Sequence, residues 1–496
     1  MALADYYARG ALAAAQVLSG FDEGRFRARL VETPVAIRIP DATNPEGEAL
    51  ADLLVRLFAR LYPRLALLGP STTVEKLGVL AKAINPAIEL VNDATVGVVI
   101  GAEAEKDAFE TTVYAGSSGW DALISTRTPQ PVGDSVNPFG PGVAACVVAA
   151  NVFRRVFLPT WEELADYELR FSAWALDRVE EPTDRPLGSA LRSPAVLVGF
   201  GAIGNAALWA LRRAPVSGAL HVVDPQQVEL GNLQRYVLTT RTDEGRDKVD
   251  LIGGPRSNSL DIVPHHASLA EFLANNGYTW ESFLLGLDSA RDRRAAQASL
   301  PRWTANAWTQ PGDLGVSVHP HFGAEGACVA CLYLPEDRLR NEDELVAESL
   351  GIPELQMDVR TLLYSGAPLQ RGFLEAVARG VSRPMEALLP FEGSSIRELY
   401  VDGFCGGAVI PLSEVGRPSE DLHVPLAHQS ALAGVLLAGT LVRSTLGGDP
   451  PITTASRINL LGPIGVALAQ PIRARRDGRC LCDDLIFRTT YERKYR

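Results

Sequence analysis

The sequence predicts an α/β protein, and three neighbouring segments predict this class. Residues 195–199 form a short apolar run typical of a buried parallel strand, which continues into the turn Gly199-Phe-Gly201-Ala-Ile-Gly204. Residues 205–213 are good helix formers, and a second apolar run at 219–223 ends on Asp224. The chain has 496 residues, of which 47% are hydrophobic, so it can form more than one core.

This β-α-β segment is typical of a nucleotide-binding unit. Gly199, Gly201 and Gly204 allow the backbone to approach a phosphate at the N-terminus of the following helix. Asp224, at the end of the second strand, can accept a hydrogen bond from a ribose hydroxyl. Dehydrogenases, methyltransferases and structural turns contain similar glycines, so this segment alone does not identify the reaction.

Polar residues beyond Asp224 narrow the reaction class. Asn232, Arg235 and Lys248 follow it along the chain. Amide and cationic groups of this kind can hold a triphosphate and neutralise the charge that develops when it is attacked. The spacing of these four residues resembles the ThiF/MoeB family, which includes the activating enzymes of ubiquitin-like proteins.

The resemblance extends over residues 195–482. The apolar run 284–287 with Asp288 resembles the family's strand that ends on a magnesium-binding aspartate, and Arg293 follows. The resemblance implies a Rossmann-like adenylation domain that uses ATP and Mg²⁺, with Arg235, Lys248 and Asp288 in catalysis. It also implies a nucleotide site formed by Gly199, Gly201, Gly204, Asp224, Asn232, Arg235, Lys248 and Asp288.

Residues 1–157 are predicted to form a second α/β layer without a Gly-x-Gly-x-x-Gly turn. After the apolar run 96–100 the chain reads Gly101-Ala-Glu-Ala-Glu-Lys, with acids where a phosphate would have to lie. This half is therefore not expected to bind ATP. The expected strands are 35–39, 88–91, 96–100 and 111–114, and the expected helices are 47–61, 73–84 and 142–157.

Two interpretations of this N-terminal half are open. It is either an unrelated accessory domain or a degenerate, inactive copy of the adenylation domain. Larger activating enzymes of the resembled family pair an inactive half with an active one, so this half would replace the second subunit of a dimer. The family's inactive half also sends an arginine into the active site, and Arg9 is a candidate, with a solvated surface arginine as the alternative.

The middle of the chain is assigned by composition and chain order. Residues 158–194 are acidic and contain prolines, and we interpret them as a linker. Residues 195–334 form the first part of the active domain, including a strand at 312–319. Residues 335–399 contain amphipathic helical segments at 342–350 and 369–381. We interpret them as an inserted helical subdomain at the place of the family's cysteine domain, with a mere family-specific insertion as the alternative.

Residues 400–496 are interpreted as a crossover loop and the rest of the active domain. A helix is expected at 427–443 and a strand at 485–487. Cys405 lies in Asp402-Gly-Phe-Cys405-Gly-Gly, where glycines would keep a loop open, and this segment resembles the family's cysteine ahead of its long crossover helix. The resemblance implies that Cys405 takes the activated acyl group as a thioester; the alternative is that it only lines the adenylate pocket.

The other cysteines predict a metal site. Cys328-x-x-Cys331 and Cys480-x-Cys482 have the paired spacing of Zn²⁺ ligands in a reducing compartment. The family usually has Cys-x-x-Cys in both pairs, so the fourth ligand is open, and His319 or His321 could substitute. Buried cysteines without a metal are the alternative. Cys146 lies in an apolar helix and is expected to be inert.

Charge and hydropathy exclude several classes. Acidic residues outnumber basic ones by 59 to 47, and the net charge of −12 gives no nucleic-acid footprint. The longest apolar window, 430–442, is shorter than the ~20 residues of a membrane span, and residues 1–20 do not resemble a signal peptide. We therefore expect a cytoplasmic protein that binds neither nucleic acid nor membrane.

Three functions are compared. The first is ATP-dependent adenylation of the C-terminal glycine of a ubiquitin-like protein, followed by an enzyme thioester and transfer to a conjugating enzyme. The second is adenylation of a sulfur carrier, peptide or small carboxylate without a thioester. The third is a non-catalytic nucleotide-binding scaffold. Asn232, Arg235, Lys248 and Asp288 argue against the third, and Cys405 with the inserted helical region favours the first. Some bacterial enzymes of the resembled kind act in antiphage defence, a role that the residues here leave open.

Overall fold

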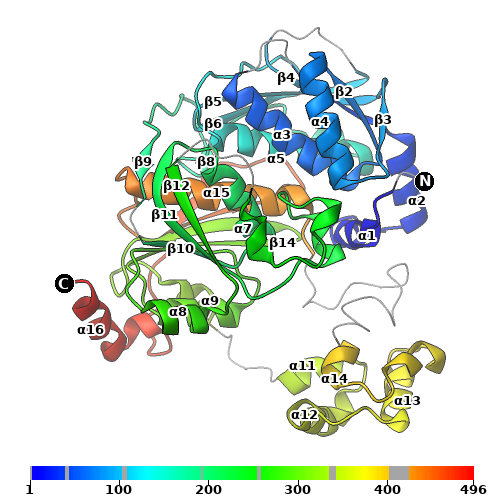
Figure 1. Cartoon of the computed structure of the whole chain (residues 1–496), viewed down its shortest axis with the longest axis vertical. Coiled ribbons are helices and arrows are strands. Elements are labelled where there is room, and N and C mark those ends of the chain that lie inside the picture. The colour runs from blue at the N-terminus through cyan, green and yellow to red at the C-terminus, as the bar shows by residue number, and fades with distance from the viewer. Residues whose placement is uncertain are drawn as a thin grey trace. The chain divides into compact units, whose positions relative to one another are not determined.

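The computed structural model describes residues 3–39, 44–102, 109–191, 194–253, 259–334, 342–400 and 424–496 (Figure 1). The chain forms two compact units. The larger consists of Met1–Leu334 and Pro425–Arg496, and the smaller of Pro335–Val424. Each unit has a hydrophobic core of its own.

The larger unit contains two mixed sheets with the same strand order. The first has the order β3-β2-β1-β4-β5-β6-β7-β8, and the second has β12-β11-β10-β13-β14-β15-β16-β17, with β9 paired to β11. In both sheets the strands up to β5 or β14 pair parallel, and those beyond pair antiparallel. The first sheet consists of β1 (Val35–Arg38), β2 (Arg64–Leu68), β3 (Glu89–Val91), β4 (Val96–Ile100), β5 (Thr111–Ser118), β6 (Asp121–Ser125), β7 (Glu168–Ser172) and β8 (Asp177–Arg178). The second consists of β9 (Ser189–Ala190), β10 (Ala195–Val198), β11 (Val216–Val223), β12 (Ser259–His265), β13 (Ser282–Leu285), β14 (Trp303–Gln310), β15 (Asp313–His319), β16 (Thr454–Ile458) and β17 (Ala469–Pro471).

The shared order makes the N-terminal half a structural copy of the nucleotide-binding half. Strand β1 takes the place of β10, β4 that of β13, and β5 that of β14. The predicted fold class is confirmed: a Rossmann-like α/β domain, an N-terminal α/β copy and a helical insertion. The copy was recognisable from architecture only, because its first strand is not followed by a glycine turn.

The helices complete the layers around these sheets. In the first half they are α1 (Tyr7–Ala15), α2 (Glu23–Glu32), α3 (Pro45–Leu61), α4 (Ser71–Ile84), α5 (Phe139–Phe157) and α6 (Trp161–Leu164). In the second half they are α7 (Ala202–Leu211), α8 (Leu269–Asn276), α9 (Ala290–Ala298), α10 (Val329–Leu332), α15 (Ala427–Thr445) and α16 (Leu485–Lys494). The helices predicted at 47–61, 73–84, 142–157 and 427–443 are confirmed as α3, α4, α5 and α15.

Helices α5 and α15 join the two halves, and Figure 1 shows α15 running through the middle of the larger unit. Both helices are almost entirely buried, and most of their residues are apolar. Gly434 of α15 permits close packing on α7, since a Cβ atom there would lie 2.3 Å from the carbonyl oxygen of Ile203. Gly439, one turn along, is less crowded: its Cβ would lie 3.5 Å from Phe139.

These two glycines predict opposite effects of alanine. Alanine is favoured over glycine within a helix by about 1 kcal/mol. Gly439→Ala should therefore keep or raise the free energy of unfolding. Gly434→Ala should lower it by about 1–3 kcal/mol or more, because a backbone carbonyl cannot move away without shifting α7. Urea unfolding of both variants tests this contrast, and equal stability of the two would contradict the packing.

Two sequence predictions are corrected. The segment 485–487, expected as a strand, begins α16, because the carboxylate of Asp484 caps this helix by accepting from the backbone N–H groups of Ile486 (2.7 Å) and Phe487 (3.2 Å). The segment 158–194, interpreted as a linker, contributes β7 and β8 to the first sheet and β9 to the second.

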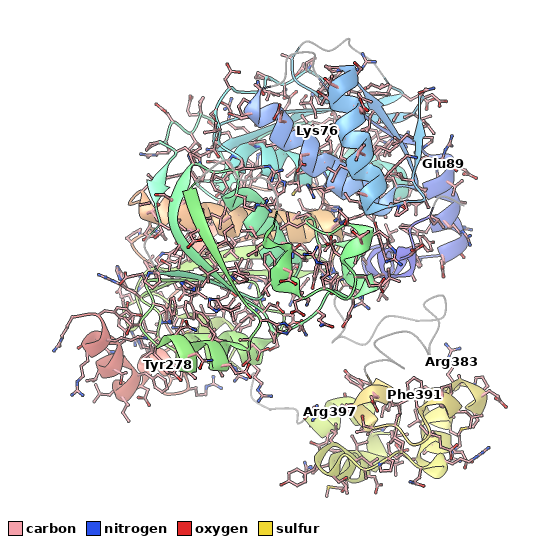
Figure 2. All side chains as sticks on the ribbon, viewed as in Figure 1. Lys76, Glu89, Tyr278, Arg383, Phe391 and Arg397 are labelled. Carbon is pink, nitrogen blue, oxygen red and sulfur yellow. The ribbon has the colours of Figure 1, made fainter. Side chains whose placement is uncertain are left out.

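The smaller unit is helical, in agreement with the insertion predicted from amphipathic segments. It contains α11 (Glu342–Ser349), α12 (Gln356–Ser365), α13 (Arg371–Gly380) and α14 (Ile396–Glu398). Leu350, Leu374 and Leu388 lie in its core. On its surface Arg397, labelled in Figure 2, forms an ion pair of 2.6 Å with Glu342. In neither unit does a described helix have the length and apolar character needed to cross a membrane.

Candidate active site and cysteine cluster

The predicted glycine turn connects β10 to α7 and requires its glycines. Gly199 has a positive φ of 87°, and a Cβ atom at Gly204 would lie 2.4 Å from the carbonyl oxygen of Gly199. Gly201 caps α7 without any side-chain hydrogen bond to the first turn. The backbone N–H groups at this helix end are therefore open to an anion such as a phosphate.

Asp224 braces the glycine turn from the end of β11. Its buried carboxylate accepts from the backbone N–H of Phe200 (2.7 Å) and of Gln226 (2.9 Å). Carboxylate oxygens have further acceptor positions, so these bonds leave capacity for a ribose hydroxyl. Asp224 therefore contacts the glycine turn directly, and its predicted bond to a ribose hydroxyl stays a prediction.

Arg235 and Lys248 meet around the ring of Tyr236. The guanidinium carbon of Arg235 lies 5.8 Å and the Lys248 ammonium 5.4 Å from the centre of this ring. A Cβ atom at Gly201 would lie 3.4 Å from the Tyr236 hydroxyl oxygen, so the ring also reaches the glycine turn. Lys248 donates to the side-chain oxygen of Gln226 at 2.6 Å. Tyr236 and Gln226 were not predicted as site residues.

Arg235 has unused hydrogen-bonding capacity. Its buried Nη1 has no hydrogen-bond partner within the described ranges. Burial lowers the pKa of the guanidinium, and the nearby Tyr236 and Asp288 act in the opposite direction. A buried donor without a partner is costly unless a ligand satisfies it, which fits a phosphate oxygen.

Asn232 and Asp288 lie at the edges of the same region. Asn232 belongs to a short 3₁₀ helix (Leu230–Gln234), where its side-chain oxygen accepts from the backbone N–H of Glu229 at 3.1 Å. Asp288 follows β13 and is exposed. Arg293 fixes the chain beside it by donating to the backbone oxygen of Leu287 and, at 2.7 Å, to that of Ala307. An exposed carboxylate next to bound phosphates suits Mg²⁺, which is usually held by one or two carboxylates and the phosphates.

Arg9 approaches this region from the N-terminal half. Helix α1 packs on the 3₁₀ helix, and a Cβ atom at Gly231 would lie 3.8 Å from the Cγ and Cδ atoms of Arg9. Arg9 therefore lies beside Gly231, the residue that precedes Asn232 at the border of the site. Arg9 is partly exposed, so its role at the site stays a prediction, with a solvated surface arginine as the alternative.

The four paired cysteines come together. All four sulfur atoms lie within 4.8 Å of one another, and four of the six Sγ–Sγ pairs are separated by 3.3 Å (Cys331–Cys480) to 3.9 Å (Cys328–Cys331). Tetrahedral coordination with Zn–S bonds of ~2.3 Å requires sulfur separations of about 3.8 Å, so the set fits Zn²⁺. Residues 325–327 and 472–474 pair through backbone hydrogen bonds next to it. The set comprises Cys328, Cys331, Cys480 and Cys482.

Histidine is not needed as a fourth ligand. Among the described residues the cluster contains the four cysteines alone. His319 is buried and bonded through Nδ1 to the carbonyl oxygen of Ala327 (2.7 Å) and through Nε2 to Ser317 Oγ (2.8 Å). Its burial lowers its pKa to about 4, so it is neutral at pH 7. Although Cys480-x-Cys482 is one residue shorter than the family's Cys-x-x-Cys, both of its sulfur atoms belong to the cluster.

We expect about one zinc ion per chain, as in a structural Cys₄ site. Cys328→Ser/Cys331→Ser should lose the metal and the stability that it contributes, since metal binding is coupled to folding. Metal analysis of purified protein measures this directly. Cys405→Ala, outside the set, is the control and should retain the zinc. A fully active, equally stable protein without zinc would refute the assignment.

Comparisons with known proteins show which family this chain resembles. Residues 185–253 match the ThiF family, and residues 38–158 match the family described as prokaryotic E2 family C. The chain is 42% identical over 509 residues to a relative from Sinorhizobium fredii (strain NBRC 101917 / NGR234), uncharacterized protein y4jF, with 100% of this chain and 98% of the relative covered. The chain belongs to the ThiF family. Members of this family are ATP-dependent adenylyltransferases, and the nucleotide site described above agrees with that class.

Solved structures with some similarity to this ThiF-family chain include E. coli MccB with MccA-N7isoASN and PaaA. MccB is 12% identical, with 59% of this chain and 68% of that chain covered and a TM-score of 0.36. PaaA is 13% identical, with 57% and 65% covered and a TM-score of 0.31.

The N-terminal half of this ThiF-family chain has its own carboxylate where the other half has an open helix end. Asn44 caps α3, and the buried Glu46 accepts from Ser117 Oγ (2.5 Å), Ser135 Oγ (2.5 Å) and the backbone N–H of Gly119 (3.0 Å). A phosphate at this helix end would meet a fixed negative charge. It remains a prediction that the N-terminal half does not bind ATP. The support comes from Glu46 at the start of α3, not from the acids after the strand at 96–100.

The sequence-based comparison at residues 101–106 is corrected by the strand order. That segment follows β4, which takes the place of β13, so the counterpart of the glycine turn is the connection between β1 and α3. The acids at 103–106 lie outside the described residues. So does Cys405. Cys146 is buried in α5, and burial raises the pKa of its thiol, which supports the prediction that this cysteine is inert.

Proposed function

We propose that this protein activates the C-terminal carboxylate of a ubiquitin-like protein by adenylation. The observation that carries this proposal is the arrangement around Tyr236: an open helix end, a lysine and a buried arginine with an unused donor converge at one ring. Such a set neutralises charge on a triphosphate and on departing pyrophosphate. A scaffold that only binds a nucleotide would not require it.

In the proposed reaction, a carboxylate oxygen of the partner attacks the α-phosphorus of ATP. The new bond joins that oxygen to phosphorus, and the bond from phosphorus to the pyrophosphate oxygen breaks. Arg235 and Lys248 stabilise the charge on the transferring phosphate and pyrophosphate, Asn232 orients them, and Asp288 holds Mg²⁺. When bound, Mg²⁺ neutralises and orients the phosphates. No proton has to be removed, because the attacking group is already a carboxylate at pH 7.

The N-terminal half is proposed to replace the second subunit of a dimer. Its helix α1 borders the active site through Arg9, and its own anion position is filled by Glu46. Arg9 is proposed as the arginine that this half adds to the phosphate site. Because the single cysteine of the segment matching prokaryotic E2 family C is the buried Cys146, we do not propose that this half carries a thioester.

The second step is proposed to use Cys405. Its sulfur attacks the acyl carbon of the adenylate, forming a thioester while the bond to the AMP oxygen breaks and AMP leaves. Four of the other cysteines form the cluster proposed to bind zinc, and Cys146 is buried. A conjugating enzyme is the expected acceptor. Because the cluster needs reduced thiols, we propose a cytoplasmic location. Adenylation of a sulfur carrier, peptide or small carboxylate without a thioester is the alternative.

Pyrophosphate exchange tests the proposal. Purified protein is incubated with ATP, Mg²⁺, labelled pyrophosphate and a ubiquitin-like protein from the same genome, with and without its C-terminal glycine. Exchange that depends on that glycine supports the proposal. Exchange that occurs only with a peptide or small carboxylate favours the alternative. Nucleotide binding without exchange for any carboxylate would overturn both and leave a scaffold.

A further inference from the structure

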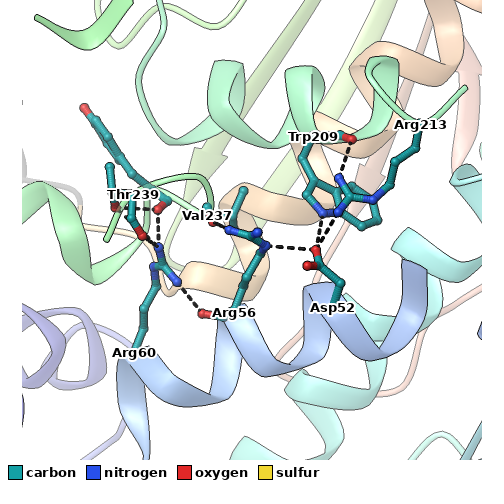
Figure 3. Close-up of polar contacts among 8 residues, drawn as sticks. Asp52, Arg56, Arg60, Trp209, Arg213, Val237 and Thr239 are labelled. Atoms are coloured by element: carbon teal, nitrogen blue, oxygen red, sulfur yellow. Dashed lines mark hydrogen bonds and ion pairs between the residues drawn. The ribbon is translucent and has the colours of Figure 1, made fainter. Parts of the chain in front are cut away.

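Helix α3 of the N-terminal half carries three polar side chains toward the active half. Asp52, Arg56 and Arg60 are spaced by four residues, so they lie along one side of the helix. Figure 3 shows them in a row, facing α7 and the loop around Val237 and Thr239. This loop directly follows Arg235 and Tyr236.

The two arginines bind the backbone of that loop. Arg60 Nη2 donates to the carbonyl oxygens of Tyr236 (2.5 Å) and Thr239 (2.6 Å), and Arg56 Nη1 donates to that of Val237 (2.8 Å). Arg60 is buried, and its Nη1 donates to the backbone oxygen of Arg56 at 2.6 Å. The Tyr236 carbonyl also accepts from the backbone N–H (3.0 Å) and the hydroxyl (2.7 Å) of Thr239, which close the turn locally. The two arginines add the contacts that tie this turn to α3.

Asp52 connects the same helix to α7. Its Oδ2 accepts from Arg56 Nε, Trp209 Nε1 and Arg213 Nη2, each at 2.8 Å. Burial would raise the pKa of Asp52, but Arg56 and Arg213 outweigh it and lower the pKa to about 2, so the group stays ionised. Helix α7 begins at the glycine turn. One side of α3 therefore holds both the phosphate-binding helix and the loop after Arg235.

Burying the charge of Arg60 against carbonyl oxygens costs desolvation free energy. Burial lowers the pKa of Arg60 to about 10, so the side chain remains charged at pH 7 in a position that disfavours charge. Two nitrogens of its guanidinium fork donate to the carbonyls of Arg56, Tyr236 and Thr239, whereas a lysine would offer one nitrogen in place of this planar pair. The arrangement fits a role in fixing geometry.

We propose that Arg56 and Arg60 are positioning residues, which hold Arg235 and Tyr236 at the distance from the glycine turn that adenylation requires. The inactive half thus acts on the active half through α3, in addition to any arginine that it supplies. The inference rests on the proposed function, because positioning matters only if Arg235 acts on a phosphate.

Arg60→Ala in the full chain is the main test, with Arg64→Ala as the matched control. Arg64 lies near α3 on β2 and donates to Val31, away from the active half. For Arg60→Ala we expect kcat for pyrophosphate exchange to fall by roughly 10- to 100-fold, the range for misplaced catalytic groups, with little change in KM for ATP. Arg60→Lys should recover only part of kcat. Arg64→Ala should behave as the wild type.

Hydrogen exchange provides a readout that does not depend on catalysis. Amides of residues 235–240 should exchange faster in Arg60→Ala than in the wild type and in Arg64→Ala. If Arg60→Ala does not fold, Arg56→Lys serves instead, since it keeps a charge beside Asp52 and loses the fork that reaches Val237. A folded Arg60→Ala protein with wild-type kcat and unchanged exchange of the loop would overturn the inference.

These readouts also separate the two proposals. If the wild type shows no pyrophosphate exchange but the loop amides lose protection in Arg60→Ala, the proposed function fails, and Arg60 is shown to hold the loop without a role in adenylation. If the wild type is active and the variant is equally active, the positioning fails and the function stands. A loss of kcat that merely follows a lower Tm, and that is absent at reduced temperature, would assign Arg60 to stability and overturn the inference.

Discussion

Arg235→Ala and Lys248→Ala are each expected to slow ATP–pyrophosphate exchange by about 100- to 1,000-fold, or about 2.7–4 kcal/mol, the usual cost of removing one electrostatic donor from an active site. The reason is their position: both cations border Tyr236, whose hydroxyl reaches the glycine turn. Lys248 has the additional hydrogen bond to Gln226 that fixes its ammonium group.

Arg246→Ala is the matched control for these variants. Arg246 lies two residues before Lys248, and its half-exposed side chain is bonded to Asp243 at 2.6 Å. Exchange should be nearly unchanged in this variant, because the half-exposed Arg246 side chain bonds to Asp243 and not to Tyr236 or Gln226. Undiminished exchange in both Arg235→Ala and Lys248→Ala would contradict the assignment of the site.

The sequence predicts those parts of the fold that depend on near neighbours. Helices α3 and α4 follow from apolar periodicity, and the turn at Gly199 follows from its glycines. The segment 485–487 is misread for the same reason: its apolar residues suggest a strand, but the decisive group is the capping carboxylate of Asp484, one residue outside. The strands within 158–194 are short and polar, and only pairing with distant strands defines them.

In the candidate site, too, the sequence predicts the residues that belong to local patterns and misses those defined by distant contacts. Asp224 and the glycines belong to a local pattern, and the cysteine pairs have a spacing with a chemical meaning. Tyr236 has no such signal, since a tyrosine in a loop is ordinary. Arg60 reads as a basic residue in the last turn of a helix, which is favourable for any helix. Its contacts with a loop that lies more than 170 residues away in the sequence arise from the packing of two halves.

The equal strand order explains how one chain can hold a half proposed to be active and a half predicted not to bind ATP. Strand order is set by buried apolar runs, which both halves keep, whereas nucleotide binding needs an open helix end. In the first half that end is filled by Glu46 and its three hydrogen bonds. Helix α3 of this half directs Asp52, Arg56 and Arg60 toward the second half (Figure 3). We therefore expect the isolated second half to be much less active than the full chain.

Cys405→Ala is expected to abolish a thiol-sensitive adduct with the ubiquitin-like partner while leaving pyrophosphate exchange intact. Adenylation needs only the carboxylate and the phosphate site, whereas the thioester needs a sulfur nucleophile. A thiol with an ordinary pKa near 8.5 is a few per cent thiolate at pH 7, which suffices against an acyl adenylate with an activated leaving group.

A non-reducing gel with ATP and the partner measures the adduct. Cys146→Ala is the control and should retain it if the protein folds, because the thiol of Cys146 is buried in α5 and burial raises its pKa. The four clustered cysteines lie within 4.8 Å of one another and are buried, so they are poor candidates for a mobile acyl carrier. An adduct that survives Cys405→Ala would move the nucleophile to another residue. Exchange without any adduct in the wild type would favour adenylation without a thioester.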